Sequence, residues 1–210
     1  VYEFVFKPDM QPEFVPGQYM EWTLPHAGAD TRGNRRYFTV ASAPSDSDMR
    51  LGVRMGPGMS SFKKALSVLS EGAVLTATSL AGEFTLPKNT AEKLIFIAGG
   101  VGITPFASML RHLLAVHERR DIVLFYAASS ESDFAYKDLL QQAEESIGLR
   151  VIYVSSGYIT EDMVREISDY RERSFYISGP DGMVRAYRKL LVGLDVPRQK
   201  IKTDFFPGLV

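Results

Sequence analysis

The sequence of 210 residues contains no cysteine, and this absence excludes several kinds of site. Disulfide frameworks, thiolate zinc sites, cysteine nucleophiles and iron–sulfur clusters held by this chain alone all need the missing thiol. The 24 Lys and Arg nearly balance the 25 Asp and Glu, which leaves a net charge of −1. Because such a chain has no global field to attract polyanions, we expect no nucleic-acid partner.

The sequence also lacks a long apolar run. Residues 94–110 are uncharged, but Gly, Thr, Pro and Ser interrupt them, so we expect no membrane insertion of this chain. No apolar leader opens it, and we expect a cytoplasmic protein or the soluble domain of a membrane protein. The abrupt start in a strand pattern, without Met, suggests a piece of a longer protein. The three histidines, at positions 26, 112 and 117, show no metal spacing, so no metal site is expected.

Residues 1–89 are expected to form an antiparallel β-barrel. Short runs with period-two alternation are separated by turn residues, and one short helix is predicted at residues 61–69. A barrel needs every edge paired, so an opening strand upstream of Val1 is expected to be missing. The predicted strands are residues 2–7, 18–24, 36–41, 50–55 and 74–80.

Residues 90–210 are expected to form an α/β domain. Apolar strands alternate strictly with amphipathic helices, which indicates a Rossmann-like parallel sheet with helices on both faces. The predicted strands are residues 94–98, 122–127, 151–154, 175–177 and 200–206, and the predicted helices are residues 105–117, 132–146, 160–167 and 182–191.

The strongest local motif joins the first of these strands to its helix. Its glycines allow close approach of a phosphate, Thr104 can cap the helix, and Pro105 suits the first turn. The helix N-terminus would then stabilise a pyrophosphate, although a Gly-rich turn can equally serve packing. The motif comprises Gly99, Gly100, Val101, Gly102, Ile103, Thr104 and Pro105.

A second strand-to-helix turn has the same form. It runs through Ser178, Gly179 and Pro180 to Met183, and both turns should lie at the carboxyl rim of the sheet. Taken alone, this turn would be an ordinary connection with Asp181 as the helix cap.

A third candidate lies in the β half. Arg36 begins a strand, and Gly58, Met59, Ser60 and Ser61 open the helix. Together with Arg54, these residues could form a second anion site, whereas an isolated Arg36 would be a surface charge.

These motifs, in this order, resemble the ferredoxin-NADP reductase superfamily over essentially the whole chain. Residues 36–39 resemble its R-x-Y-[ST] flavin motif and residues 58–61 its G-x-x-[ST] turn. Residues 81–84 resemble its glycine-aromatic segment, residues 99–105 its G-G-x-G-x-T-P turn, and residues 178–180 its C-G-P segment. The resemblance implies a flavin-binding barrel followed by an NAD(P)-binding domain.

The resemblance also implies roles for individual residues. Arg36 would hold the flavin pyrophosphate, Phe38 beside Tyr37 would lie against the flavin, and Thr39 would hydrogen-bond near flavin N5. Ser60 and Ser61 would bind flavin phosphate, and residues 100–104 would cradle the dinucleotide. Ser178 and Met183 would border the nicotinamide, with Thr39 and Ser178 as the catalytic candidates. The terminal segment Asp204, Phe205 and Phe206 resembles the ending that covers the flavin in some members.

Two positions depart from the family pattern. Phe38 replaces Tyr, which keeps a stacking face but loses the hydroxyl, and Tyr37 points to the other side of the strand. Ser178 replaces Cys, which removes a soft thiol beside the nicotinamide.

The function that the resemblance implies is FAD-dependent transfer of a hydride from NAD(P)H to flavin N5, followed by delivery of single electrons to an iron–sulfur, haem or membrane-embedded acceptor. Near Ser129, the acidic residues Glu131 and Asp133 and the lack of a cation before Lys137 favour NADH. One alternative is a non-catalytic nucleotide-binding or regulatory module. Another is the reductase half of an oxygen- or nitric-oxide-metabolising haem protein, which differs only in the acceptor.

Overall fold

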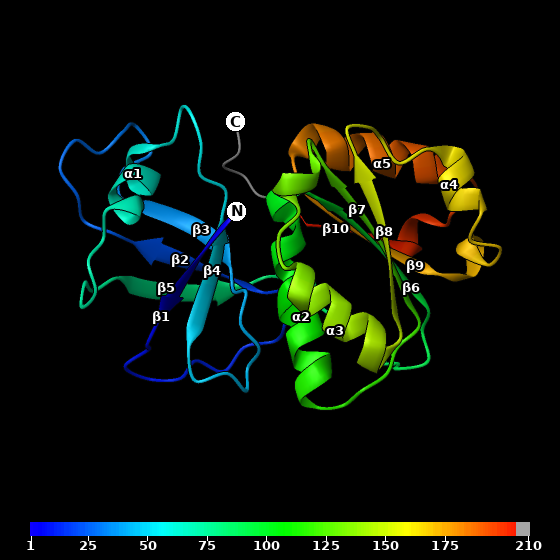
Figure 1. Cartoon of the computed structure of the whole chain (residues 1–210), viewed down its shortest axis with the longest axis horizontal. Helices are drawn as coiled ribbons and strands as arrows, with labels where there is room; N and C mark the ends of the chain where they lie inside the picture. The colour runs from blue at the N-terminus through cyan, green and yellow to red at the C-terminus, as the bar shows by residue number, and fades with distance from the viewer. Residues whose placement is uncertain (205–210) are drawn as a thin grey trace.

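The structure is a computed structural model that describes residues 1–204 (Figure 1). Its first half is built from short antiparallel strands and one helix, and its second half from a parallel sheet with helices on both faces. Within the described residues, no helix has the length and apolar character to cross a membrane. The elements of the β half are β1 (Tyr2–Phe6), β2 (Tyr19–Thr23), β3 (Arg35–Thr39), β4 (Met49–Val53), α1 (Ser61–Ser67) and β5 (Thr76–Ala81).

The strands of the β half form two sheets. β1 pairs with β4, and β2 lies between β3 and β5, all antiparallel. A single bridge from Val40 to Leu51 links the end of β3 to β4. The antiparallel architecture matches the prediction, but the described strands form two separate sheets and do not close into a barrel. The core between the sheets contains Met20, Trp22, Leu24, Val40, Leu51, Val53, Phe62 and Leu66.

The second half contains a five-stranded parallel sheet in the order β10-β9-β6-β7-β8. Its central strands are buried on both faces, which explains their continuous apolar sequences. The strands are β6 (Leu94–Gly99), β7 (Ile122–Ala128), β8 (Leu149–Ser155), β9 (Ser174–Ser178) and β10 (Ile201–Asp204), and the α-helices are α2 (Thr104–Ala115), α3 (Lys137–Ile147), α4 (Glu161–Arg165) and α5 (Asp181–Gly193).

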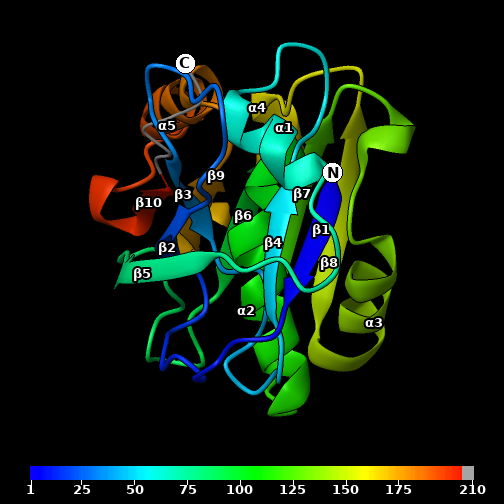
Figure 2. The same cartoon turned by 90° about the vertical axis from the view of Figure 1, so that its left-hand side faces the viewer.

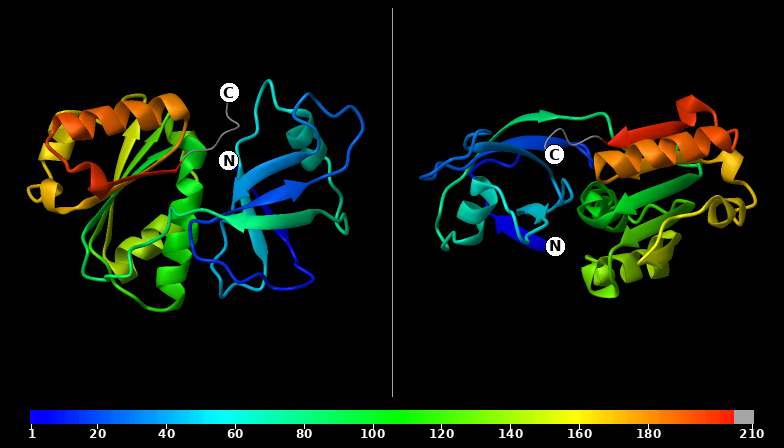
Figure 3. Two further views of the ribbon diagram at one scale, coloured as in Figure 1. Left: turned by 180° about the vertical axis from the view of Figure 1, so that it is seen from behind. Right: turned by 90° about the horizontal axis from the view of Figure 1, so that it is seen from above.

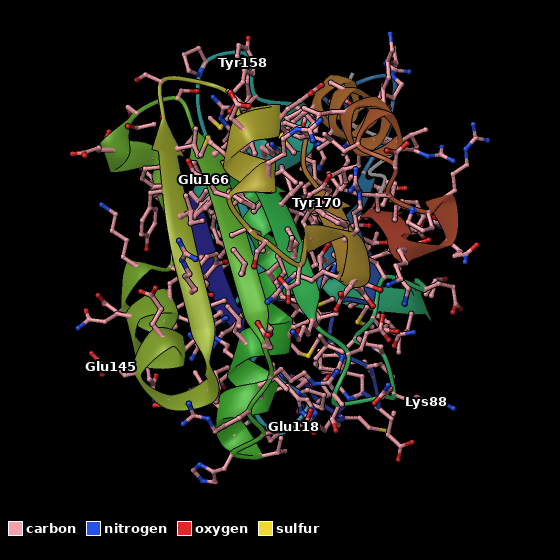
Figure 4. All side chains as sticks on the ribbon, turned by 90° about the vertical axis from the view of Figure 1, so that its right-hand side faces the viewer. Lys88, Glu118, Glu145, Tyr158, Glu166 and Tyr170 are labelled. Carbon is pink, nitrogen blue, oxygen red and sulfur yellow. The ribbon has the colours of Figure 1, made fainter. Side chains whose placement is uncertain are left out.

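The helices cover the two faces of this sheet in pairs. α2 and α3 cover the face toward the β half, and α4 and α5 cover the other (Figures 2 and 3). Figure 4 shows the side turned away from the β half, with Tyr158 beyond the carboxyl end of β8 and Glu118 at the opposite end of the sheet. α2 therefore lies between the sheet and the β half.

The strand order places a topological switch point between β6 and β9. β6 and β9 pair directly, but the chain leaves β6 toward β7 on one side and leaves β9 toward β10 on the other. Ligands of open α/β sheets bind outside the carboxyl ends of strands at such a point. Both Gly-rich turns identified in the sequence follow these two strands.

The helix predicted for residues 132–146 begins five residues later than expected. Phe134 lies in an extended conformation between Tyr126 and Tyr153, at ring-centroid distances of 5.0 and 4.8 Å. The backbone N–H of Ala135 donates to the hydroxyl of Tyr126, and Tyr136 is left-handed with φ 60°. These aromatic contacts override the local helix pattern, so α3 starts at Lys137.

The last predicted strand, residues 200–206, is seen as β10 from Ile201 to Asp204. Lys200 instead ends a 3₁₀ turn that begins at Arg198. Phe205 and Phe206, proposed from the sequence to cover a flavin, lie outside the described residues.

Candidate active site at the sheet switch point

The two Gly-rich turns pack directly against each other. A Cβ atom added to Gly102 would lie closer than 3.0 Å to the carbonyl oxygen of Ser178, and one added to Gly99 would meet the Met183 side chain equally closely. Gly179 in turn lies against Gly99 and Met183. These glycines are therefore required for contact between the two turns. This is the packing role that the sequence allowed as an alternative to phosphate binding.

Gly100 differs from its neighbours because it faces open space. Its φ is +53°, which favours glycine, and nothing lies within 4 Å of where a Cβ would be. It begins a 3₁₀ turn through Val101 to Ile103 that runs into α2. Gly100 is therefore the glycine of this motif whose surroundings leave room for a ligand.

Thr104 does not cap a helix in the way the sequence predicted. It is the first residue of α2, and its hydroxyl donates to the carbonyl oxygen of Val101 at 2.7 Å. The hydroxyl thus stabilises the preceding 3₁₀ turn, and the N-terminal amides of that turn receive no side-chain cap. Pro105 occupies the second helical position, where no N–H donor is needed.

In the second turn, Pro180 rather than Asp181 occupies the N-cap position of α5. Asp181 is the first helical residue, and its carboxylate pairs with Arg185 one turn later. Asp181 is therefore an ordinary helix residue, and the capping role predicted for it is wrong. The Pro180 carbonyl accepts from the Val184 N–H at 3.0 Å, which starts the helix directly behind the turn.

Ser178 has an acidic neighbour that the motif did not indicate. Its hydroxyl lies 3.4 Å from a carboxylate oxygen of Asp204, because the two residues are register partners at the ends of β9 and β10. Both side chains are buried. Burial raises the pKa of Asp204 to about 7, and the hydrogen bond from Ser178 opposes this shift.

Arg36 is engaged within the β half. One terminal nitrogen donates to the carbonyl oxygens of residues 32, 33 and 35, and the other lies 2.7 Å from the carboxylate of Asp30. The guanidinium also lies over the Phe62 ring at 5.6 Å. Arg36 is thus half-buried and holds the preceding loop together by hydrogen bonds. The alternative interpretation of Arg36 as an isolated surface charge is therefore wrong.

Asp30 also contacts the helix turn that was predicted to bind phosphate. Its carboxylate accepts the backbone N–H of Ser61 at 3.1 Å, while the Ser61 hydroxyl contacts the Asp30 N–H and His26, both at 2.9 Å. Desolvation raises the pKa of Asp30, but the hydrogen bonds from Ser61, Arg36 and Arg32 outweigh it and lower the pKa to about 2. A carboxylate therefore takes the anion position that the sequence assigned to a phosphate.

The remaining residues of this predicted site lie around α1. The Ser60 hydroxyl caps the helix by accepting the N–H of Lys63, whose ammonium donates to the Arg54 carbonyl. Gly58 has φ +74° and open space around it. An open hollow of about 670 Å³ is lined by His26, Ala27, Gly28, Asp30, Met59, Ser60, Ser61, Lys64, Ala65 and Val68.

Thr39 is one of four buried side chains in residues 1–204 with an unpaired polar atom, together with Trp22, Arg36 and Tyr136. Thr39 is 3% exposed, and its hydroxyl has no hydrogen-bond partner among the described residues. Buried hydroxyls are normally paired, so this one fits a polar ring atom such as that of a flavin. On the same strand, Phe38 packs against Phe62 and Tyr37 points outward, 48% exposed, as the alternation predicts.

The segment after β7 forms a tight acidic turn. The hydroxyl of Ser130 meets Ser132 and Asp133 at 2.9 Å, and Ser129 and Glu131 are exposed. Lys137 is directed to the Phe134 ring at 5.9 Å. Separately, no group of three or more His, Cys, Asp or Glu side chains in residues 1–204 could hold a metal ion.

Comparison with known proteins finds one matching family model and several relatives. Residues 96–189 match the family described as oxidoreductase NAD-binding domain. The flavohemoprotein of Halalkalibacterium halodurans is 29% identical over 215 residues, which covers 92% of this chain and 52% of that protein. The chain therefore spans about half the length of the curated relatives it matches.

Two solved structures share the two-part fold. The flavohem-like FAD/NAD-binding domain of nitric oxide dioxygenase from Vibrio cholerae has a TM-score of 0.84 and 20% identity, covering 97% of this chain and 91% of that one. A ferredoxin-NADP⁺ reductase variant from Plasmodium falciparum has a TM-score of 0.78 and 16% identity, covering 97% and 88%. At these identities the likeness establishes the fold alone.

Proposed function

We propose that the chain is an NAD(P)H-dependent flavin oxidoreductase module of the ferredoxin-NADP reductase superfamily, which its sequence and fold resemble. Residues 1–89 would bind FAD and residues 90–210 the nicotinamide nucleotide. The observation that carries the proposal is the contact of Gly102 with Ser178, since it joins the two candidate nucleotide turns at the switch point of the sheet.

The chain's own residues supply binding and alignment. The uncapped amides at Gly100 would receive the pyrophosphate of the nucleotide, and the Thr39 hydroxyl would pair with a polar flavin atom. Ser178 would border the nicotinamide, with Met183 packed behind the turn. A bound flavin would supply the hydride acceptor and release electrons singly.

NADH is the proposed donor. A 2′-phosphate on the nucleotide needs a cation near the end of β7, where this chain has Glu131 and Asp133 instead. The proposed acceptor is a separate one-electron centre (iron–sulfur, haem or membrane-embedded), and the name of the flavohemoprotein relative makes haem the first acceptor to test. The proposed location is the cytoplasm, for the module alone or as the soluble domain of a membrane protein.

The test is an anaerobic absorbance spectrum of the protein with FAD, before and after addition of NADH or NADPH. Loss of the flavin band near ~450 nm on adding nucleotide is the expected result. Flavin binding without reduction by either nucleotide would favour the non-catalytic module, which Phe38 and Ser178 keep open because both depart from the family pattern.

A matched pair of variants tests the nucleotide turn. Gly100→Asp and Gly100→Asn have similar size and similar tolerance of positive φ, but only Asp adds a negative charge. We expect Gly100→Asp to abolish reduction by NADH through repulsion of the pyrophosphate, and Gly100→Asn to retain it in part. Equal loss in both variants would argue against a phosphate at this turn.

A further inference from the structure

Gly52 of the β half lies against Tyr136 and against Thr104, the residue that directly follows the 3₁₀ turn of the candidate nucleotide site. A Cβ atom added to Gly52 in β4 would lie closer than 3.0 Å to the Tyr136 hydroxyl and 2.9 Å from the Thr104 hydroxyl. The φ of Gly52 is not in the left-handed region, so its backbone conformation does not require glycine. The absence of a side chain there is therefore explained by the close approach of the two halves.

Tyr136 is held in an unusual conformation at this contact. Its φ of 60° and ψ of 27° are uncommon for a bulky residue. Burial raises the pKa of its hydroxyl, and the nearby Glu3 carboxylate adds to this effect while Arg111 opposes it. The Arg111 guanidinium lies over the Tyr136 ring at 5.4 Å. Such a conformation persists only where the surroundings fix the side chain.

Polar contacts hold the halves together beside this glycine. The Glu3 carboxylate lies 3.0 Å from Arg111 of α2 and 2.9 Å from Arg50 of β4. Arg111 also donates to the Ala41 carbonyl at 2.6 Å, and Ser108 donates to the Ser42 carbonyl at 2.7 Å. α2 is thus bonded directly to Ala41 and Ser42, which follow Val40, and through Glu3 to Arg50, which precedes Leu51, so the approach at Gly52 is a fixed contact.

A second glycine, Gly17, allows α2 to approach the β half closely at a point farther along the helix. A Cβ atom at Gly17 would overlap the Phe84 carbonyl and approach the Met109 side chain of α2. Besides its polar contacts, α2 therefore approaches the β half closely at two glycines, Gly17 beside Met109 and Gly52 beside Thr104. Figures 1 and 2 show α2 along the whole border with the β half.

The contact at Gly52 connects the two proposed cofactor positions by a short path. Thr39 precedes Val40, Val40 bridges to Leu51, and Leu51 precedes Gly52. Gly52 then meets Thr104, which follows the turn of residues 99–103. Gly52 thus stands on the shortest described path between Thr39 and that turn.

We propose that Gly52 is a positioning residue: by admitting Tyr136 and Thr104, it sets the distance between the flavin half and the nucleotide turn, and thereby the alignment for hydride transfer. The proposal rests on the proposed function of both halves. Misplacement of reacting groups by about 1 Å can reduce a rate about 100-fold, so one added methyl group is enough to test it.

The experiment compares Gly52→Ala with Gly56→Ala in the same protein reconstituted with FAD. Gly56 has no positive φ and nothing within 4 Å of its Cβ position, so its variant controls for the change from glycine to alanine. We expect Gly52→Ala to slow flavin reduction by NADH at least about 10-fold, with the dissociation constants for FAD and NAD⁺ within about twofold of wild type. Gly56→Ala should match wild type in the rate of flavin reduction and in the dissociation constants for FAD and NAD⁺.

Rescue separates positioning from general damage. The Tyr136 hydroxyl is the atom nearest to the added methyl group, so Tyr136→Phe in the Gly52→Ala background should restore part of the rate. If Gly52→Ala does not fold, Arg111→Lys takes its place, because it retains the charge but loses the paired contacts to Glu3 and Ala41. Its expected result is again a slower reduction rate at unchanged affinities.

The outcomes distinguish this proposal from the one it rests on. If wild type does not bind FAD or is not reduced by NADH, the proposed function fails. If wild type is reduced and Gly52→Ala matches Gly56→Ala, the positioning role fails. A loss of FAD affinity as large as the loss of rate would also overturn it, since Gly52 would then act on flavin binding alone. If Arg111→Lys is used instead, an unchanged rate of flavin reduction by NADH would also overturn the positioning role.

Discussion

The carboxylate of Asp30 lies 2.7 Å from the guanidinium of Arg36, and its other oxygen accepts the backbone N–H of Ser61 at 3.1 Å. One carboxylate thus joins the two groups that the sequence assigns to a flavin phosphate. A phosphate that binds both groups has to displace Asp30 or share them with it. Because both ligands are anionic, they compete for the same position.

Removing the charge of Asp30 should therefore strengthen flavin binding. Asp30→Asn retains an oxygen that can accept hydrogen bonds but removes the competing charge, and we expect FAD affinity to rise about 3- to 10-fold, which is about 0.7–1.4 kcal/mol. Fluorescence titration with FAD measures this directly. A fall in affinity would mean instead that Asp30 positions Arg36 for the flavin.

The stability of the protein should depend on the ionisation of Asp204. Its pKa is about 7 in the folded protein and near 3.8 ordinarily, so between these values the folded state binds more protons than the unfolded state. Stability from this group is fully present below pH 3.8 and is lost as pH rises through 7, by at most about 1.4 kcal/mol per pH unit. In thermal unfolding, the melting temperature of Asp204→Asn relative to that of wild type should rise as pH increases from 5 to about 8. A constant difference would contradict the burial of this carboxyl.

Gly102 should tolerate no side chain. Gly102→Ala would place a methyl group against the Ser178 carbonyl, and overpacking of this kind lowers stability by about 1–3 kcal/mol. Gly182→Ala is the matched control, because nothing lies within 4 Å of its Cβ position in α5, and it should raise stability by roughly 0.5–1 kcal/mol. Urea unfolding of both variants measures the difference. Equal stabilities would show that the two turns are not in contact in solution.

Nucleotide preference should be altered at the turn after β7. Glu131→Arg adds a cation where a 2′-phosphate would lie, and we expect the ratio of kcat/KM for NADPH to that for NADH to rise about 10-fold or more. Glu131→Gln removes the negative charge without adding a cation and should change the ratio less. A ratio that is the same in both variants would place the adenosine ribose elsewhere.

The order of strands and helices was accessible from the sequence because each element has its own signature. Apolar runs buried on both faces specify β6, β7 and β9, and helix periodicity specifies α2 and α5. The start of α3 was not accessible, since it depends on Phe134 fitting between two tyrosines from other strands. Barrel closure was overestimated, because pairing between strands is a tertiary property.

The candidate site likewise contains residues that could be predicted from the sequence and residues that could not. The strand pattern located both turns, because they follow predicted strand ends, whereas Thr39 was singled out by the resemblance of residues 36–39 to the family's flavin motif. The pattern could not separate the packing glycines from Gly100, since all have the same side chain and differ only in their neighbours. It also missed Asp30 and Gly52, whose roles come from partners six or more positions away, at Arg36, Tyr136 and Thr104.

The ion pair between Glu3 and Arg111 spans 108 positions of the chain. At synthesis rates of about 5–20 residues per second, Glu3 leaves the ribosome roughly 5–20 s before its partner. During that interval the face of β4 that carries Gly52 has no helix to cover it. The border of the β half is therefore exposed during that interval, and the surroundings of Gly52 are complete only once Tyr136 has followed α2 out of the ribosome.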